Sequence, residues 1–410
     1  MLTISVLSLS FDMKIGELEV SEAGEVNAEW LTQQVGRSVK SAVITNFDEK
    51  LGGLSGEFNV VEVLFADGQS CSLILKRTTP HKIAEAAALG TPREALFLKD
   101  FGPRVAGVVP RTYYGYGNME TGEKVVLMEK FNDAVPAGIF FGASNPNNWG
   151  IKDKIGELME GNPSAVEVSK IAFRLYAELH AAFWEEESVL RCTWLRASDW
   201  LQGEGRESWL RAQQMAADAW QEQKAASSEG TSKITWDEHT AACIDASMAK
   251  IAWEGYQEQL KCLPWTVVHG DCHPHNTMWI NQRSPQASLR LIDFEMVGVG
   301  SPVQELGQFL ISHMEPAARR AHERELITCY YDHLVKQLQL HGVSQEVVHD
   351  FTFEKCWKEY VQGGAGRWLW FVPYLAKVCP ASMAQFFHDQ LCAFLHDHLP
   401  SPSDAPMPRV

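Results

Sequence analysis

Carboxylate and amide side chains follow two apolar strand candidates in the second half of the chain. Asp271 follows the segment that begins at Val267, and Asn276 stands five residues after it. Asp293 and Glu295 follow the second apolar segment. Phosphoryl transfer needs few protein groups: one that orients the attacking hydroxyl, and hard oxygen ligands for Mg²⁺. We therefore predict that Asp271 receives a substrate hydroxyl. Asn276 and Asp293 are the predicted Mg²⁺ ligands, with Glu295 as a ligand of a second ion.

Each of these features alone has a simpler structural explanation. An aspartate after a glycine is commonly a turn residue, and a carboxylate at a strand end is commonly solvated. It is their combination, in this order and on two strand candidates, that favours a catalytic role.

The segment around Asp271 also permits a second interpretation, a zinc site. Four potential ligands occur within it: His269, Cys272, His273 and His275. Two histidines four residues apart can bind zinc from one face of a helix. Gly270 and Pro274 disfavour a helix there, and no glutamate follows the first histidine. The phosphotransferase interpretation is therefore preferred, with zinc as the alternative.

The N-terminal third has the pattern of a small β-rich lobe. The predicted elements are strands over residues 57–65, 70–76 and 125–128, a short helix capped by Asn27, and a helix over residues 92–100. Asp67-Gly68 is typical of a tight hairpin turn in which both central residues have positive φ. Residues 1–131 are predicted to form this lobe.

The remainder of the chain is predicted to be mostly helical. The clearest helix covers residues 164–184, where Ser164 and Glu167 have the spacing of a capping box. Residues 132–399 are predicted to form a second lobe. The Pro/Ser-rich tail, residues 400–410, is expected to be disordered.

The segment around Asp271 resembles the motif of aminoglycoside phosphotransferases and choline kinase-like proteins, including the ecdysteroid kinase-like branch. That motif has His-Gly-Asp, an Asn five residues after the Asp, and a later Asp on a strand. Leu179-His180-Ala181 is similar to a segment that such proteins carry upstream, and Asp293-Phe294-Glu295 resembles the corresponding strand of choline kinases. The resemblance covers about residues 27 to 310.

This resemblance implies an α+β, two-lobed protein-kinase-like fold, with ATP and Mg²⁺ as cofactors. The implied activity is O-phosphorylation of a small hydroxylated metabolite or xenobiotic. Two alternatives stay open: a choline or ethanolamine kinase in the narrow sense, and a pseudokinase that binds without turnover.

The resemblance also implies nucleotide contacts in the N-terminal lobe. A glycine-rich turn over the phosphates would contain Gly52, Gly53, Ser55 and Gly56, with Leu51 in place of the first glycine of the family pattern. Lys76, at the end of a strand, would bind the phosphates and pair with Glu94, for which Glu85 is the competing partner. The hinge that binds adenine would contain Met128, Glu129 and Phe131.

One departure and one aromatic region concern the second lobe. Glu305 stands where many relatives carry an aspartate, and we expect it to tie down the catalytic loop.

The C-terminal aromatics, interrupted by Gly363-Gly364-Ala365-Gly366, suit either a cation–π pocket or a helix core. The candidate substrate residues are His273, Trp357, Tyr360 and Trp368.

Composition limits the partners. The chain has 410 residues, 45% of them hydrophobic, with 36 basic against 52 acidic residues and a net charge of −16. Such a surface repels phosphate backbones and anionic lipids, so we expect a small-molecule substrate and neither nucleic acid nor membrane as a partner. Nine cysteines without C-x-x-C spacing predict reduced thiols. Together with an N-terminus that does not read as a signal peptide, this predicts a cytoplasmic protein.

Overall fold

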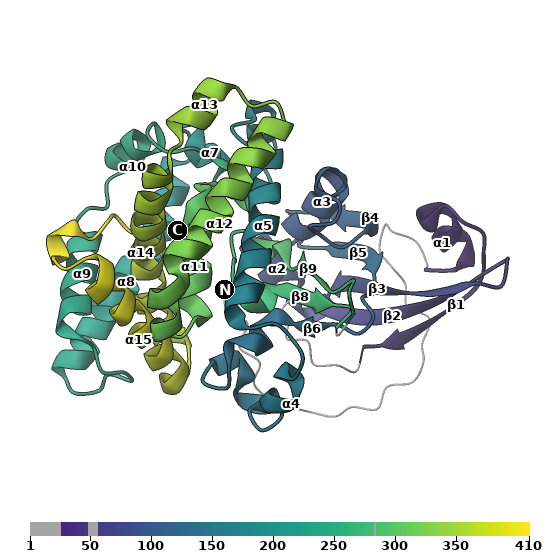
Figure 1. Ribbon diagram of the computed structural model, residues 1–410, viewed down its shortest axis with the longest axis horizontal. Helices are drawn as coiled ribbons and strands as arrows, with labels where there is room; N and C mark the ends of the chain where they lie inside the picture. The colour runs from purple at the N-terminus through teal and green to yellow at the C-terminus, as the bar shows by residue number, and fades with distance from the viewer. Residues whose placement is uncertain (1–25, 48–55, 283) are drawn as a thin grey trace. The chain divides into compact units, whose positions relative to one another are not determined.

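The computed structural model describes residues 26–47, 56–282 and 284–410, and they fall into two compact units (Figure 1). The first unit comprises residues 1–132 together with residues 293–296, and the second comprises residues 133–292 and 297–410. The segment that carries Asp293 and Glu295 therefore belongs to the first unit, although most of the sequence around it belongs to the second. Gly52, Gly53 and Ser55 of the predicted glycine-rich turn lie outside the described residues.

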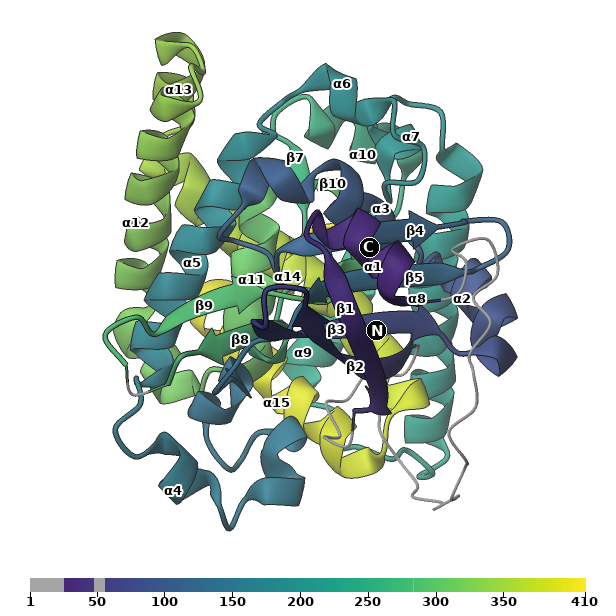
Figure 2. The same ribbon diagram turned by 90° about the vertical axis from the view of Figure 1, so that its right-hand side faces the viewer.

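A five-stranded antiparallel sheet forms the first unit, and Figure 2 shows its strands from a second side. The strand order is β1-β2-β3-β5-β4. The strands are β1 (Val39–Asn46), β2 (Gly56–Phe65), β3 (Ser70–Thr78), β4 (Thr112–Gly117) and β5 (Lys124–Glu129). The helices are α1 (Ala28–Val35), α2 (Ile83–Leu89) and α3 (Arg93–Asp100), with short 3₁₀ segments η1 (Pro80–Lys82), η2 (Gly102–Val105) and η6 (Phe294–Met296). The predicted strands and helices of this region are confirmed.

Local sequence explains how two of these elements begin and end. Asn27 caps α1, and its side chain accepts a hydrogen bond from the Trp30 amide at 3.0 Å, as predicted. The β2–β3 turn differs from the prediction, because Gly68 has a positive φ of 86° and Asp67 does not. The Asp67 carboxylate instead accepts a hydrogen bond from the Gln69 amide at 3.0 Å. Such a bond lets a short polar side chain stabilise a turn without left-handed backbone.

Helices dominate the second unit, so the predicted α+β fold class is confirmed. Its helices are α4 (Ile155–Met159), α5 (Ala165–Ala182), α6 (Glu187–Leu190), α7 (Ser198–Leu201), α8 (Arg206–Ser228), α9 (Glu238–Met248), α10 (Trp253–Leu260), α11 (Pro302–His313), α12 (Pro316–Leu340), α13 (Gln345–Asp350), α14 (Phe353–Val378) and α15 (Ala381–His398). Its 3₁₀ segments are η3 (Ala137–Phe141), η4 (Pro146–Ile151), η5 (Pro274–Asn276) and η7 (Pro402–Asp404). Ser164 and Glu167 form the predicted capping box at the start of α5.

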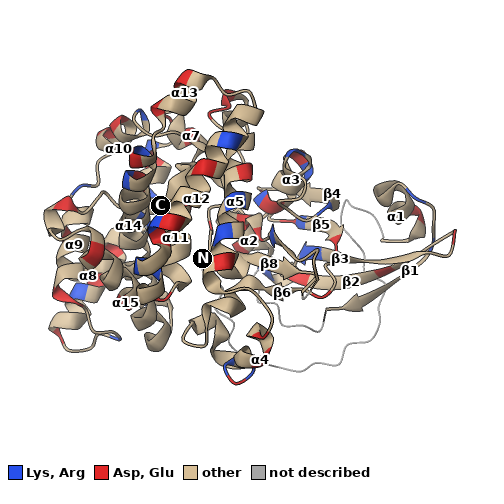
Figure 3. Ribbon diagram, in the orientation of Figure 1, with Lys and Arg blue, Asp and Glu red and all other residues tan. Residues whose placement is uncertain are grey.

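Two small antiparallel sheets position the loops of the second unit. One pairs β7 (Thr266–Val268) with β10 (Gly298–Gly300), and the other has the order β6-β8-β9. The strands of the latter are β6 (Val135–Pro136), β8 (Thr277–Ile280) and β9 (Ser288–Leu291). Both signs of charge are spread over the helices of this unit (Figure 3). No helix among the described residues is long and apolar enough to cross a membrane.

Glycines allow α11 and α14 to cross in backbone contact. A Cβ atom added to Gly307 would lie 2.4 Å from the Cα of Gly364, and one added to Gly364 would lie 2.8 Å from the Cα of Gly307. No real Cβ atom tolerates such distances, so only glycine fits on both sides of the crossing. This gives the glycine-rich interruption of the aromatic segment a structural reason.

The expectation that residues 400–410 are disordered is wrong. The Ser247 hydroxyl donates to the Pro406 carbonyl at 2.6 Å, and the Gln213 amide donates to the Pro408 carbonyl at 2.7 Å. Arg409 forms an ion pair with Glu359, and its backbone amide donates to a carbonyl of α14. The composition of the tail suggests disorder, but these contacts with α8, α9 and α14 fix its backbone.

Candidate active site

The loop after β7 places Asp271 in the second unit. Gly270 has a positive φ of 81°, which turns the chain immediately before Asp271. The Asp271 side chain is largely buried. The Asn276 amide nitrogen donates to the Asp271 carbonyl at 2.9 Å and to its Oδ2 at 3.2 Å. Because the nitrogen is used in these bonds, the Asn276 side-chain oxygen is the atom that could bind a metal ion.

Glu305, on α11, anchors the backbone of this loop. Its carboxylate accepts hydrogen bonds from the His269 amide at 3.0 Å and from the Gly270 amide at 2.7 Å. The same carboxylate contacts His180 Nε2 at 3.0 Å, and His180 Nδ1 lies 2.9 Å from the Tyr330 hydroxyl. The expectation that Glu305 ties down the loop that carries Asp271 is confirmed. His180, from the segment that resembles an upstream family motif, holds Glu305 in place.

An ion network in the first unit surrounds Lys76 on β3. Lys76 Nζ lies 2.8 Å from Glu94 Oε2, on α3, so Glu94 rather than Glu85 is the partner, as predicted. The same nitrogen lies 3.0 Å from Asp293 Oδ1 and 3.2 Å from Glu295 Oε1. These three carboxylates raise the pKa of Lys76 well above its usual value despite burial, which acts to lower it. Lys76 is therefore charged at any physiological pH.

Sequence analysis did not identify Lys124, the second cation of this network. Lys124 begins β5, and its side chain is fully buried. Its Nζ lies 2.7 Å from Glu94 Oε2 and 2.6 Å from Glu295 Oε1. The cluster thus holds two cations and three carboxylates. Burial raises the pKa of Glu94, but Lys124 and Lys76 outweigh it and leave the pKa below the usual value.

The Asp293 segment has an unusual backbone conformation, and ring stacking holds it in place. Asp293 has a positive φ of 66°, which is unusual for a residue with a side chain and is often found at functional sites. Phe294, the next residue, stacks on Phe97 of α3 with ring centroids 4.3 Å apart. Burial raises the pKa of Asp293, and Lys76 opposes that effect.

The predicted metal and nucleotide residues are therefore distributed as follows. Asp293 and Glu295 lie in the first unit beside Glu94, within one group of carboxylates, and Asn276 lies with Asp271 in the second unit. Gly56 begins β2, and Met128 and Glu129 end β5, with Phe131 just after it. Glu129 Oε1 accepts a hydrogen bond from the Arg111 amide at 2.7 Å. The roles of these residues in binding stay predictions.

Among the candidate substrate residues, His273 is the one that lies beside Asp271. Its Nε2 is 3.5 Å from Asp271 Oδ2, and its ring lies parallel to that of His313 with centroids 5.4 Å apart. His313 was not predicted. It belongs to α11, and its distance in sequence from the loop hid this contact.

The three aromatic candidates on α14 have the contacts of core residues. The buried Tyr360 hydroxyl donates to Glu323 at 2.8 Å. Trp357 lies against Tyr360 with centroids 5.3 Å apart, and Trp368 stacks on Phe387 at 5.5 Å. Their substrate role stays a prediction that these contacts do not support.

The zinc alternative stays a prediction, for which His273 and His275 offer ligand atoms: with His313 they form a group whose ring nitrogens lie within 4.8 Å of one another. His269 Nε2 lies 2.8 Å from the Ile292 carbonyl, and its Nδ1 accepts from the Asp271 amide at 3.3 Å. His273 Nδ1 likewise accepts from the His275 amide at 3.2 Å. The Nε2 atom of His273 has no hydrogen-bond partner among the described residues, so it is the atom that His273 offers to a ligand.

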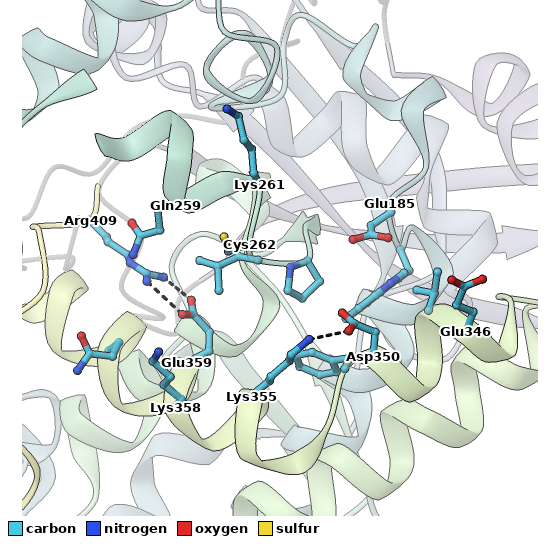
Figure 4. A pocket seen from close by; sticks show the side chains of 16 residues that line it. Glu185, Gln259, Lys261, Cys262, Glu346, Asp350, Lys355, Lys358, Glu359 and Arg409 are labelled. Atoms are coloured by element: carbon cyan, nitrogen blue, oxygen red, sulfur yellow. Dashed lines mark hydrogen bonds and ion pairs between the residues drawn. The ribbon is translucent and has the colours of Figure 1, made fainter. Parts of the chain in front are cut away.

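A separate pocket of about 700 Å³ lies in the second unit (Figure 4), and none of the predicted site residues lines it. Two ion pairs join residues of its lining. Lys355 Nζ lies 2.8 Å from Asp350, and Arg409 pairs with Glu359.

A family model described as the ecdysteroid kinase-like family matches residues 197–343. The predicted resemblance is confirmed over that part of the chain. A search of curated proteins found no match.

The chain also resembles several solved structures. An ethanolamine kinase from Plasmodium vivax is 9% identical, with 90% of this chain and 87% of that chain covered and a TM-score of 0.40. A choline kinase from Streptococcus pneumoniae is 14% identical, with 90% and 97% covered and a TM-score of 0.40. An aminoglycoside 2′-phosphotransferase in complex with GDP is 10% identical, with 90% and 95% covered and a TM-score of 0.45.

Proposed function

We propose that this protein is an ATP- and Mg²⁺-dependent kinase that phosphorylates a hydroxyl group of a small metabolite or xenobiotic. The observation that carries the proposal is the setting of Asp271. It is a buried carboxylate fixed by Asn276, on a loop whose backbone is anchored by Glu305. The match of residues 197–343 to the ecdysteroid kinase-like family supports it.

The chemistry assigned to Asp271 is that of a general base. Its carboxylate would accept the proton of the substrate hydroxyl as the hydroxyl oxygen bonds to the γ-phosphorus of ATP. The bond from that phosphorus to the bridging oxygen breaks, and the products are ADP and a phosphate ester. Positioning and charge stabilisation supply most of the rate in such reactions.

The first unit would bind the nucleotide. Lys76 keeps its charge and is held by Glu94, so it is suited to contact the phosphates. The residues that would hold Mg²⁺ are Asn276, Asp293 and Glu295, whose side-chain oxygens are the hard ligands that this ion prefers. Bound Mg²⁺ neutralises negative charge on the phosphates.

Asp271→Asn tests the proposal within a phosphoryl-transfer screen across hydroxylated metabolites, with products followed by mass spectrometry. The variant should fold normally and lose about 10²- to 10⁴-fold in turnover, the usual contribution of a general base. The exposed Asp153→Asn is a matched control and should keep full activity.

Three outcomes of this screen are decisive. Near-full turnover by Asp271→Asn would remove Asp271 from the mechanism. Formation of phosphocholine or phosphoethanolamine would narrow the activity to a choline or ethanolamine kinase. Binding of ATP and Mg²⁺ by the wild type without transfer to any acceptor would indicate a pseudokinase instead.

A further inference from the structure

A buried arginine lies against the loop that carries Asp271. Arg367, on α14, is 2% exposed. Its Nη2 donates to the Gly270 carbonyl at 3.4 Å, and its Nε donates to Gln308 Oε1 at 3.3 Å. Gln308, on α11, in turn donates to Asp271 Oδ1 at 3.5 Å. A continuous chain of contacts therefore runs from Arg367 through Gln308 to Asp271.

The glycine crossing explains how Arg367 reaches this position. Gly307, which precedes Gln308, touches Gly364, which is one turn before Arg367 on α14. Side chains at either glycine would push the two helices apart and pull Arg367 away from Gln308. Gly307 and Gly364 thus allow the Arg367 guanidinium to reach the loop that carries Asp271.

The burial of this guanidinium is only partly compensated by its own contacts. A buried charge is costly unless it is paired and fully hydrogen-bonded, yet Nη1 of Arg367 has no hydrogen-bond partner among the residues that the structure describes. Its guanidinium lies over the Phe371 ring at 4.2 Å, which recovers part of the cost. Burial and then the nearby Arg196 lower the pKa of Arg367, and the negative charges of Asp271 and Glu305 oppose that effect.

Asp271 is the carboxylate left for Arg367 to balance. Glu305 is already engaged by two backbone amides and His180. The other titratable groups around Asp271 are His269, Cys272 and His273 of its own loop, Tyr176 of α5 and His313 of α11. The hydrogen bonds in the chain are long, at 3.3–3.5 Å, so charge and orientation matter more here than the strength of any one bond.

We propose that Arg367 is a positioning residue of the phosphotransfer site, which orients Asp271 through Gln308. This inference rests on the proposed function. Arg367 does not touch the reacting atoms and acts only through Asp271 and the backbone of its loop.

Arg367→Met tests the proposal, since methionine keeps an apolar stem and removes the charge. Arg409→Met is the matched control, because Arg409 also packs against α14, at Gly366, and pairs with Glu359 rather than with the catalytic loop. Arg367→Met should lower turnover about 10²-fold at neutral pH and leave the thermal shift caused by ATP and Mg²⁺ unchanged. Arg409→Met should keep turnover near that of the wild type.

Conservative replacement and chemical rescue separate positioning from simple loss of structure. Arg367→Lys keeps a charge but not the planar fork that contacts Gly270 and Gln308, so its turnover should lie between that of Arg367→Met and that of the wild type. Guanidinium added to Arg367→Ala at millimolar concentration should restore part of the turnover, whereas urea should not.

A measurement independent of turnover keeps this inference distinct from the proposed function. Carboxyl ¹³C NMR of aspartate-labelled protein at pH 7, with Asp271→Asn for assignment, reports the surroundings of the Asp271 carboxylate directly. A displaced Asp271 resonance in Arg367→Met, with no displacement in Arg409→Met, supports the inference even if no acceptor is found. An unchanged resonance in Arg367→Met, or equal losses of turnover in the two variants, would overturn it. If Arg367→Met does not fold, Gln308→Leu decides the orientation step by the same loss of kcat.

Discussion

The two charged sites of this protein are stabilised in opposite ways. In the first unit, Lys76 and Lys124 share three carboxylates within one buried network. In the second unit, Asp271 is held mainly by neutral donors, Asn276 and Gln308, with a single arginine nearby. A mutually paired network couples charge to stability, because loss of one partner leaves others buried and unpaired. A carboxylate in a neutral cradle can instead be changed at a cost to chemistry and little cost to folding.

Removal of Lys124 should give the largest change in stability and so tests this contrast most directly. Lys124→Met leaves Glu94 and Glu295 with Lys76 as their shared cation. We expect the free energy of unfolding of the first unit to fall by about 3–5 kcal/mol, the usual cost of breaking a buried ion pair. Denaturant unfolding of the variant measures this.

Lys99→Met is the control for that experiment, since Lys99 lies exposed on α3. It should change stability by less than about 0.5 kcal/mol. Equal stability of Lys124→Met and Lys99→Met would show that the network does not couple charge to folding in the first unit.

Glu305 offers a second, smaller test in the second unit. Its two oxygens accept from the His269 and Gly270 amides, and a glutamine could accept with only one of them. Glu305→Gln therefore leaves a buried amide unsatisfied, at a cost of about 1–3 kcal/mol. Glu305→Asp retains both acceptors and should lose less. Thermal unfolding ranks the three proteins, and a Glu305→Gln protein as stable as the wild type contradicts the anchoring role.

The same contrast explains which residues the sequence could predict. Lys76 with Glu94 follows from a strand end and a nearby helix, and the Ser164 capping box is a local pattern. Asp271 and Asn276 are five residues apart, so one motif contains both. In each case the signal lies within a short stretch, or within the order of motifs along the chain.

Other site residues depend on contacts between distant segments. Lys124 is 171 residues from its partner Glu295, and alone it reads as an ordinary solvated lysine. Arg367 is 97 residues from Gly270 and is surrounded in sequence by aromatic residues typical of a helix core. The glycine-rich segment of α14 is visible in the sequence, but only the packing of the helices determines that it meets α11. The order of the tail likewise depends on distant segments, since Gln213 of α8 and Ser247 of α9 donate hydrogen bonds to its carbonyls.

The histidines beside Asp271 allow a test with a smaller expected effect, because they make the stability of the second unit depend on pH. Burial, and then the nearby His273, lowers the pKa of His275 to about 3. Since the folded pKa lies below the unfolded value of about 6.5, the unfolded chain binds more protons between these values. The stability contributed by neutral His275 is therefore full above pH 6.5 and is lost as the pH falls towards 3.

This loss amounts to about 1.4 kcal/mol for each pH unit below 6.5. His275→Gln removes the titrating ring, so its unfolding temperature should fall less between pH 7 and pH 5 than that of the wild type. The exposed His341→Gln should follow the wild type. Parallel pH profiles for wild type and His275→Gln would show that His275 titrates alike in the folded and unfolded protein. The assignment of a buried, neutral His275 to the Asp271 loop would then be wrong.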